Sequence, residues 1–202
     1  MIGSSGGRGD TRRNLQLLLA LRPILCADSD VDRTLENVAL EIASSVADYC
    51  IVDMRVAGAR SRRLVVAHAD SSRLEDLRAA AERFVATPDG RVARGLVAKS
   101  AELVSHPRRK RNDDGDFEFL GEQTATSYVQ APLRARGEPF ALITFVCTKA
   151  KPYDEGSLKL FEEVIAWCGL FVERALLRNV RGDTAEPSSR LMKRVRVGTK
   201  RS

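Results

Sequence analysis

Residues 49–70, YCIVDMRVAGARSRRLVVAHAD, decide the fold that this sequence predicts. Between residues 50 and 56 every second side chain is apolar, and Asp53 and Arg55 fall on the opposite face of the extended chain. This period of two is typical of a β-strand with one buried face. Gly58 interrupts the strand, so that a second apolar run can return beside it as the other arm of a hairpin.

The second run, residues 64–67, ends on the polar side chains of His68 and Asp70. Side chains at the end of a strand lie at the rim of a sheet, where a few polar groups commonly orient a ligand. The hairpin therefore predicts a sheet with candidate binding groups at one rim.

The composition is that of one globular domain. Of the 202 residues, 44% are hydrophobic and 30% are charged. This composition can form one hydrophobic core, in a single domain of roughly 150 residues with unstructured terminal segments. The apolar runs are far shorter than the ~18 residues of a membrane span, and residues 1–13 lack the hydrophobic segment of a secretory signal. These features predict a cytoplasmic protein without a membrane partner.

The net charge of +6 belongs to the C-terminal tail. Residues 188–202 of this tail carry six basic residues and no acidic one: Arg190, Lys193, Arg194, Arg196, Lys200 and Arg201. The rest of the chain therefore sums to about zero. Two interpretations stay open, a solvated terminus or a segment that binds nucleic acid through counterion release.

Helical patterns flank the hairpin. A leucine-rich stretch at residues 12–26 precedes it, followed by a helix that Ser29 caps and that runs to about Val46. After the hairpin, Ser72 opens another capped helix, and residues 91–99 suit a short one. The hairpin is thus predicted to lie between two pairs of helices.

The C-terminal half predicts further strands and a long helix. Residues 102–104 suit a short strand, and residues 126–133 and 139–147 suit two strands joined by a tight turn. Asp154 caps a helix that runs to about Leu177. The predicted class is α+β, with an antiparallel sheet and the first and last helices together on one face.

At this point residues 28–177 resemble a GAF domain, of the kind found in bacterial histidine kinases and regulated phosphatases. The resemblance is carried by ADSDVDRTLENVALEIASSVADYCIVDM (27–54), RRLVVAHAD (62–70), PDGRVARGLVAKSAELV (88–104), SYVQAPLRARGEPFALITF (127–145) and PYDEGSLKLFEEVIAWCGLFVERALL (152–177). It implies a PAS-related antiparallel sheet, with terminal helices on one face and short helices and loops over a pocket on the other. The expected organisation is a disordered N-terminus (1–10), a dimerisation helix (11–27), the GAF domain (28–179) and a basic disordered tail (180–202).

The resemblance also implies a function. Such domains are small-molecule sensors and dimerisation units, and a neighbouring kinase, cyclase, phosphatase or DNA-binding domain usually carries the output. No such domain is recognisable here. We therefore expect a non-catalytic, homodimeric module of bacterial signal transduction that binds a small molecule or contacts a separate effector protein. The alternatives are a nucleic-acid-associated regulator that uses the tail and a thiol-based reductase or redox sensor.

The resemblance and the strand patterns together place two sets of site residues. The candidate pocket residues are His68, Asp70, Phe84, Val92, Leu96, Tyr128, Gln130 and Thr144. The candidate dimer residues, on the terminal helices, are Leu18, Leu25, Leu158, Phe161, Ile165, Cys168, Val172 and Ala175. The alternative for the pocket set is structural: Asp70 caps the next helix, and Tyr128 and Gln130 form hydrogen bonds within the core.

The cysteines and histidines indicate no metal or catalytic site. The four cysteines lie singly in apolar runs, at Cys26, Cys50, Cys147 and Cys168, which predicts buried reduced thiols. The two histidines do not form a zinc-ligand pattern, and no nucleophile with a nearby base is recognisable. The cofactor is left unknown, with a haem held by His68 or His106 as one alternative.

Overall fold

The structure, a computed structural model, describes residues 7–27, 30–56, 61–105 and 124–183, together with Phe117 and Leu120. The elements follow in the order α1 (Gly7–Ala27), α2 (Val31–Ser45), β1 (Tyr49–Arg55), β2 (Ser61–His68), the 3₁₀ helix η1 (Ser71–Arg73), α3 (Leu74–Arg83), α4 (Arg91–Val97), β3 (Glu102–Ser105), β4 (Ser127–Ala135), β5 (Glu138–Cys147) and α5 (Glu155–Asp183). None of these helices combines the length and the hydropathy that a membrane span requires.

The strands form one sheet with the order β2-β1-β5-β4-β3. Every neighbouring pair is antiparallel. Both predicted hairpins are present, because β1 pairs with β2 and β4 pairs with β5. The predicted α+β class with an antiparallel sheet is confirmed.

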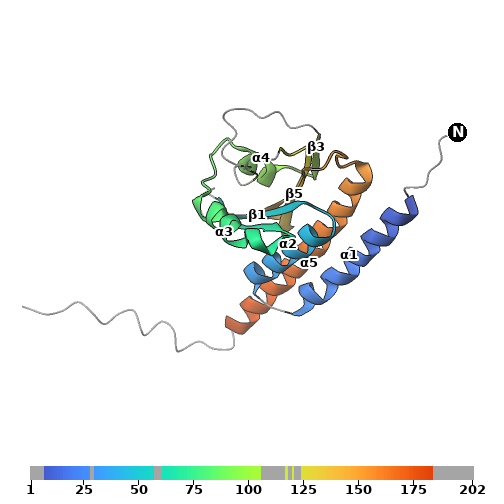
Figure 1. Ribbon diagram of the computed structural model, residues 1–202. Coiled ribbons are helices and arrows are strands. Elements are labelled where there is room, and N and C mark those ends of the chain that lie inside the picture. The colour runs from blue at the N-terminus through green and yellow to red at the C-terminus, as the bar shows by residue number, and fades with distance from the viewer. Residues whose placement is uncertain are drawn as a thin grey trace, which may run out of the picture.

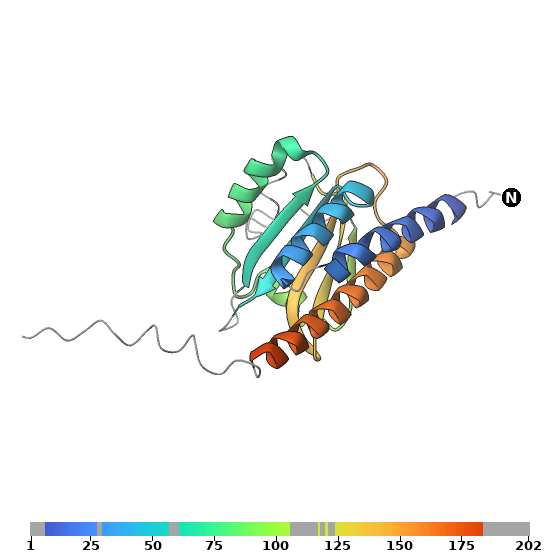
Figure 2. The ribbon, with the colours of Figure 1, turned by 90° about the horizontal axis from the view of Figure 1, so that it is seen from below.

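Helices cover both faces of the sheet (Figures 1 and 2). On one face α2 and α5 pack over the strands with α1 packed against these two helices, and on the other face lie α3 and α4. The first face holds the larger core, in which the rings of Phe145 from β5 and Phe161 from α5 stack with their centroids 3.9 Å apart. The terminal helices α1 and α5 lie side by side in both views.

The helix starts follow local capping rules. Asp154 caps α5, since its Oδ1 accepts a hydrogen bond of 2.9 Å from the backbone N–H of Ser157, as predicted. The cap of α2 was predicted one residue too early. The residue that caps α2 is Asp30, which accepts from the N–H of Arg33 at 3.2 Å, whereas Ser29 lies outside the described residues.

The terminal helices are longer than predicted. α1 begins at Gly7, within the stretch expected to be disordered, and α5 continues to Asp183, four residues into the expected tail (180–183). Once a helix is nucleated, each added residue gains one backbone hydrogen bond, so a helix extends beyond its last buried side chain. The remainder of the tail, with its six basic residues, lies outside the described residues.

The prediction that β1 has one buried face is wrong. Its first six residues are all buried, and Asp53 has an exposed fraction of 0%. The second face is also covered, because Ile51 packs with residues of α3 such as Leu77. A carboxylate in the middle of β1 is therefore enclosed within the protein.

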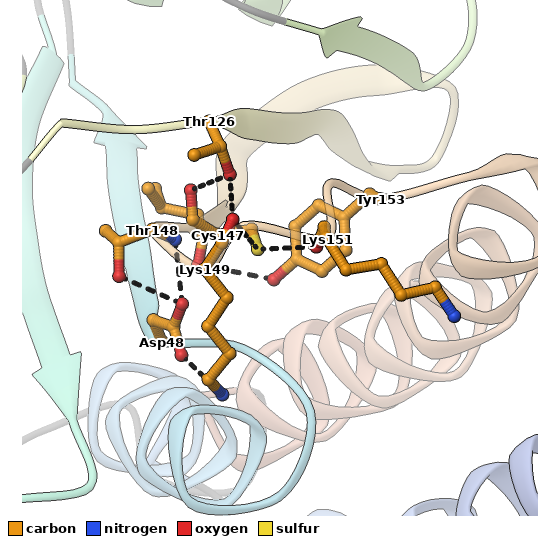
Figure 3. Close-up of polar contacts among 8 residues, drawn as sticks. Asp48, Thr126, Cys147, Thr148, Lys149, Lys151 and Tyr153 are labelled. Carbon is orange, nitrogen blue, oxygen red and sulfur yellow. Dashed lines mark hydrogen bonds and ion pairs between the residues drawn. The ribbon is translucent and has the colours of Figure 1, made fainter.

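A hydrogen-bond network joins the sheet to the start of α5 (Figure 3). Asp48, just before β1, accepts from the N–H of Thr148 at 2.7 Å and from its hydroxyl at 3.0 Å, and lies 2.7 Å from the Nζ of Lys149. The hydroxyl of Tyr153 donates to the carbonyl of Val146 at 3.3 Å. These contacts fix the connection through which the chain passes from β5 into α5.

The same network predicts a loss of stability in acid. Burial raises the pKa of Asp48, but hydrogen bonds from Lys149 and Thr148 outweigh it, and the pKa is lowered from its usual range. A depressed folded-state pKa stabilises the fold above the unfolded-state value and ceases to do so as pH falls through the folded-state value. We expect the free energy of unfolding to decline below about pH 4, and less steeply in Asp48→Asn.

Urea unfolding at a series of pH values measures this dependence. The control is Asp76→Asn, which removes an exposed carboxylate of α3. Identical pH profiles for the wild-type protein and Asp48→Asn would contradict the assignment.

Candidate functional site

Three charged side chains are buried on the sheet face that carries α3 and α4. Asp53 lies on β1, Arg63 lies directly opposite it on β2, and Arg91 is the first residue of α4. Their exposed fractions are 0%, 7% and 5%. Charged groups are rarely buried to this degree unless they are paired.

Asp53 joins the two arginines. Its Oδ1 accepts from the Nε of Arg63 at 2.8 Å, and its Oδ2 lies 3.4 Å from the Nη2 of Arg63. The same Oδ2 lies 3.6 Å from the Nη2 of Arg91. The Nη1 of Arg91 donates to the hydroxyl of Thr144 on β5 at 2.8 Å. We call these four residues the Asp53 cluster.

Aromatic rings line the Asp53 cluster. The guanidinium carbon of Arg63 lies 3.5 Å from the centre of the Phe84 ring. That of Arg91 lies 5.1 Å from the ring of Phe117 and 5.9 Å from that of Tyr128. Ring faces attract cations, and this attraction offsets part of the cost of removing guanidinium groups from water.

A row of polar side chains extends from the cluster to the edge of the sheet. Thr144 pairs with Gln130 on β4, and Gln130 pairs with Glu102 on β3. The Nε2 of Gln130 donates to the Oε2 of Glu102 at 2.8 Å. Gln130 is only 6% exposed, and its Oε1 has no hydrogen-bond partner among the described residues. We call Glu102, Gln130 and Thr144 the polar row.

The chemistry of this face suits the binding of a small molecule. It offers cations, a hydroxyl and an amide in largely apolar surroundings, which is the usual composition of a ligand site. Within the described ranges no group of three His, Cys, Asp or Glu residues is placed to hold a metal ion.

Six of the eight predicted pocket residues gather around this face. Thr144 and Gln130 belong to the polar row, and Phe84 and Tyr128 supply ring contacts to the two arginines. The other two, Val92 and Leu96, are buried against Leu142 beneath α4. Helix α4 can approach the sheet closely here because Gly95 has no Cβ. A Cβ at this position would lie 2.7 Å from a methyl group of Leu142.

His68 and Asp70 lie elsewhere. Tyr49 and Val146 separate His68 from Tyr128 across the sheet. The N–H of Asp70 donates to the Nδ1 of His68 at 2.9 Å. Asp70 accepts from the N–H of Ser72 at 2.9 Å and so caps η1. The capping alternative for Asp70 therefore describes its contacts, and the prediction that Ser72 caps the next helix is wrong.

A second hollow lies at the β2 edge of the sheet. It has a volume of about 540 Å³ and is lined by His68 and Asp70 together with residues of α2 and α3, among them Leu40 and Leu74. The predicted pocket set thus divides between this hollow and the polar row. His106, the other candidate haem ligand, lies outside the described residues.

The three charged residues of the cluster were not among the predicted site residues. Asp53 has the position of a solvent-facing residue in the period-two pattern, and Arg63 lies near a turn among other arginines. One sequence feature could have indicated the pair of Asp53 and Arg63, namely an acidic residue inside an apolar strand with an arginine on the partner strand of its hairpin. Arg91 carries no comparable local signal, since it contacts the cluster only through the tertiary fold.

Three cysteines are buried and one is exposed. Cys26 is exposed on α1, which corrects the prediction that all four are buried. Burial raises the pKa of the Cys168 thiol to about 12, and burial also raises that of Cys50. Thiols of this kind are poor nucleophiles at neutral pH because the thiolate is scarce.

Most predicted dimer residues pack in the core of the chain itself. Leu25, Phe161, Cys168, Val172 and Ala175 are buried, and Leu18, Leu158 and Ile165 are partly buried. The heptad pattern selected the side of α5 that packs on the sheet. The same two helices expose other large apolar residues, namely Leu15, Leu19, Trp167, Leu170 and Leu177, which we call the helix face.

Comparison with solved structures finds this fold in GAF domains. The GAF domain of a phosphoenolpyruvate-protein phosphotransferase (ptsP) from Coxiella burnetii has a TM-score of 0.65 at 10% identity, over 84% of this chain and 98% of that one. The GAF domain of a putative sensor histidine kinase from Pseudomonas syringae pv. tomato has a TM-score of 0.54 at 14% identity, over 87% and 96%. Free methionine-R-sulfoxide reductase from Neisseria meningitidis, in complex with its substrate, has a TM-score of 0.66 at 10% identity, over 88% and 98%.

The chain therefore has the fold of a GAF domain, as its sequence resemblance implies. No protein-family model and no curated protein matches the sequence. At these identities the comparisons establish the fold, and the function has to be argued from the site.

Proposed function

We propose that this chain is a GAF sensory module that binds a small molecule at the polar row and the Asp53 cluster, forms a homodimer, and acts on a separate effector protein. The observation that carries the proposal is the Asp53 cluster, a set of buried charges beside a buried amide oxygen that has no hydrogen-bond partner among the described residues. Strongly interacting buried charges concentrate at functional sites. The GAF domains of a phosphotransferase and a putative sensor kinase share the fold.

Native mass spectrometry of protein purified under gentle conditions tests the binding proposal. We expect a retained small molecule on the wild-type protein and a reduced retained fraction on Thr144→Val, which removes one hydroxyl from the polar row at nearly constant volume. The matched control is Thr148→Val, outside the site, in the network of Asp48. If Thr144→Val and Thr148→Val retain the molecule equally, the molecule binds at another site. If the wild-type protein carries no small molecule, the binding proposal is contradicted.

The dimer proposal rests on the helix face. Leu19 of α1 and Leu170 of α5 have exposed fractions of 58% and 68%. Side-by-side helices that both expose leucine offer a second copy apolar side chains to bury, and burying a leucine contributes about 1.5–3 kcal/mol. Exposed Cys26 on α1 gives a site for a crosslinking probe.

Light scattering on a sizing column measures the dimer. We expect the wild-type protein to be dimeric at micromolar concentration, and the double variant Leu19→Glu/Leu170→Glu to raise the dissociation constant by at least about a hundredfold. The control is Val97→Glu, which adds a charge at an equally exposed position on α4, where 71% of the residue is accessible. A monomeric wild-type protein would overturn the dimer proposal.

A further inference from the structure

We infer that the ligand of this site is a small monocarboxylate that carries a hydroxyl or amino group next to its carboxylate. The inference rests on the proposed function and names the class of ligand for the same site. It follows from the hydrogen-bond donor that Gln130 lacks and the acceptor that Thr144 lacks among the described residues, and from the charges beside these two residues.

Gln130 requires a hydrogen-bond donor. Its Nε2 already donates to Glu102, while its Oε1 has no partner among the described residues although Gln130 is only 6% exposed. A buried acceptor without a donor costs free energy, and native proteins generally fill such a position. A ligand hydroxyl or ammonium group would supply the missing donor.

Thr144 requires an acceptor. Its oxygen accepts from the Nη1 of Arg91 at 2.8 Å, so its own hydroxyl proton points to another atom. No hydrogen bond donated by Thr144 is present among the described residues. An acceptor next to this guanidinium is most favourable when it carries negative charge, and a carboxylate oxygen accepts without bringing a competing donor.

The two requirements lie side by side. Gln130 and Thr144 are directly opposite on β4 and β5, which places their Cβ atoms about 5 Å apart. A carboxylate with a donor on the adjacent carbon presents an acceptor and a donor at a spacing that can bridge them. The carboxylates of Glu102 and Asp53 flank this position and repel a second negative charge, so the ligand is a monoanion.

The polar row begins at an exposed residue. Glu102 is exposed on β3, which is the outer strand of the sheet. Gln130 is its neighbour, and Thr144 is one strand further in. The polar row therefore runs from the outer strand of the sheet inward to the Asp53 cluster.

Three probes of similar size separate the two requirements. Lactate carries a carboxylate and an adjacent hydroxyl, propionate lacks the hydroxyl, and lactamide lacks the charge. By titration calorimetry on the full chain we expect lactate to bind about three- to tenfold more tightly than propionate, and at least about tenfold more tightly than lactamide. In Gln130→Leu the preference for lactate over propionate disappears, and Gln130→Met serves as a second variant if the first does not fold.

Each outcome bears on a different claim. Equal binding of lactate and lactamide overturns the monocarboxylate class. Equal binding of lactate and propionate to the wild-type protein overturns the donor. If none of the three binds while native mass spectrometry finds a neutral molecule that Thr144→Val releases, the ligand class is wrong and the proposed function stands. If none of the three binds and the purified protein carries no small molecule, the proposal that this site binds a ligand is contradicted as well.

Discussion

Asp53→Asn is expected to lower the free energy of unfolding by about 3–5 kcal/mol. The substitution keeps the size of the side chain but removes the negative charge that lies between Arg63 and Arg91. Both guanidinium groups then stay buried without the carboxylate that compensates them, and each loses a charge-assisted hydrogen bond or ion pair. Urea unfolding of the two proteins at neutral pH measures the difference.

The chain contains a matched control for this substitution. Arg62 and Asp32 form a pair of the same two residue types at the surface, where the side chains are each 47% exposed. Exposed pairs contribute up to about 1 kcal/mol, so Asp32→Asn should cost no more than that. Similar losses for the two variants would mean that the enclosure of Asp53 has little energetic consequence.

Stability and binding can be separated at the same cluster. A buried ion cluster is often replaced by apolar residues of similar volume without loss of stability. We therefore expect the triple variant of Asp53, Arg63 and Arg91 to methionine to recover most of the stability lost in Asp53→Asn. Its affinity for the ligand should not recover, because the guanidinium group that donates to Thr144 has been removed.

The architecture was predictable because it depends on local patterns. The alternation in residues 50–56 and the cap at Asp154 each determine an element from a few neighbouring residues, and both elements are present in the structure. The predicted turn at Gly58 lies outside the described residues. Period two also divides a strand into two faces. It does not reveal whether a second layer covers the polar face, and here α3 and α4 do.

Local sequence patterns could not predict the Asp53 cluster, and the reason is geometric. The pairing of β1 with β2 shifts by one residue between Val52 and Asp53, and this irregularity brings Asp53 opposite Arg63. Regular continuation from the pair of Val52 and Val65 would have placed a different residue there. Arg91 joins from a helix that lies far along the chain, so only the folded arrangement brings the three charges together.

The dimer residues illustrate a second limit of periodicity. An apolar stripe on a helix marks a buried face, whether it is buried against its own domain or against another copy. Residues such as Phe161 and Cys168 satisfy the first alternative, since they pack on the sheet. The exposed leucines of the helix face fall outside the strongest stripe and become visible only after the domain core is assigned.

Phe161→Ala is expected to destabilise the fold by about 3–5 kcal/mol. The ring of Phe161 is 1% exposed, stacks on that of Phe145, and contacts Tyr153 edge-on with the centroids 5.1 Å apart. Its removal leaves a cavity between α5 and the sheet, which the surrounding strands cannot fill by collapse. Thermal unfolding measures the loss, and Val85→Ala, at a residue that is 77% exposed, should change stability by no more than about 0.5 kcal/mol.

The same ring connects the two halves of the proposed function. Thr144 belongs to the polar row, and the next residue of β5, Phe145, faces the opposite side of the sheet and stacks on Phe161 of α5. If ligand binding shifts β5, this contact is the direct route to α5 and the helix face. In the wild-type protein we expect lactate to change the dimer dissociation constant. The milder variant Phe161→Leu keeps the core apolar, so we expect it to bind lactate as the wild-type protein does but to show a smaller change in the dimer dissociation constant. Binding and dimer affinity are linked reciprocally, so an unchanged effect of lactate in Phe161→Leu would show that the signal does not pass through this stack.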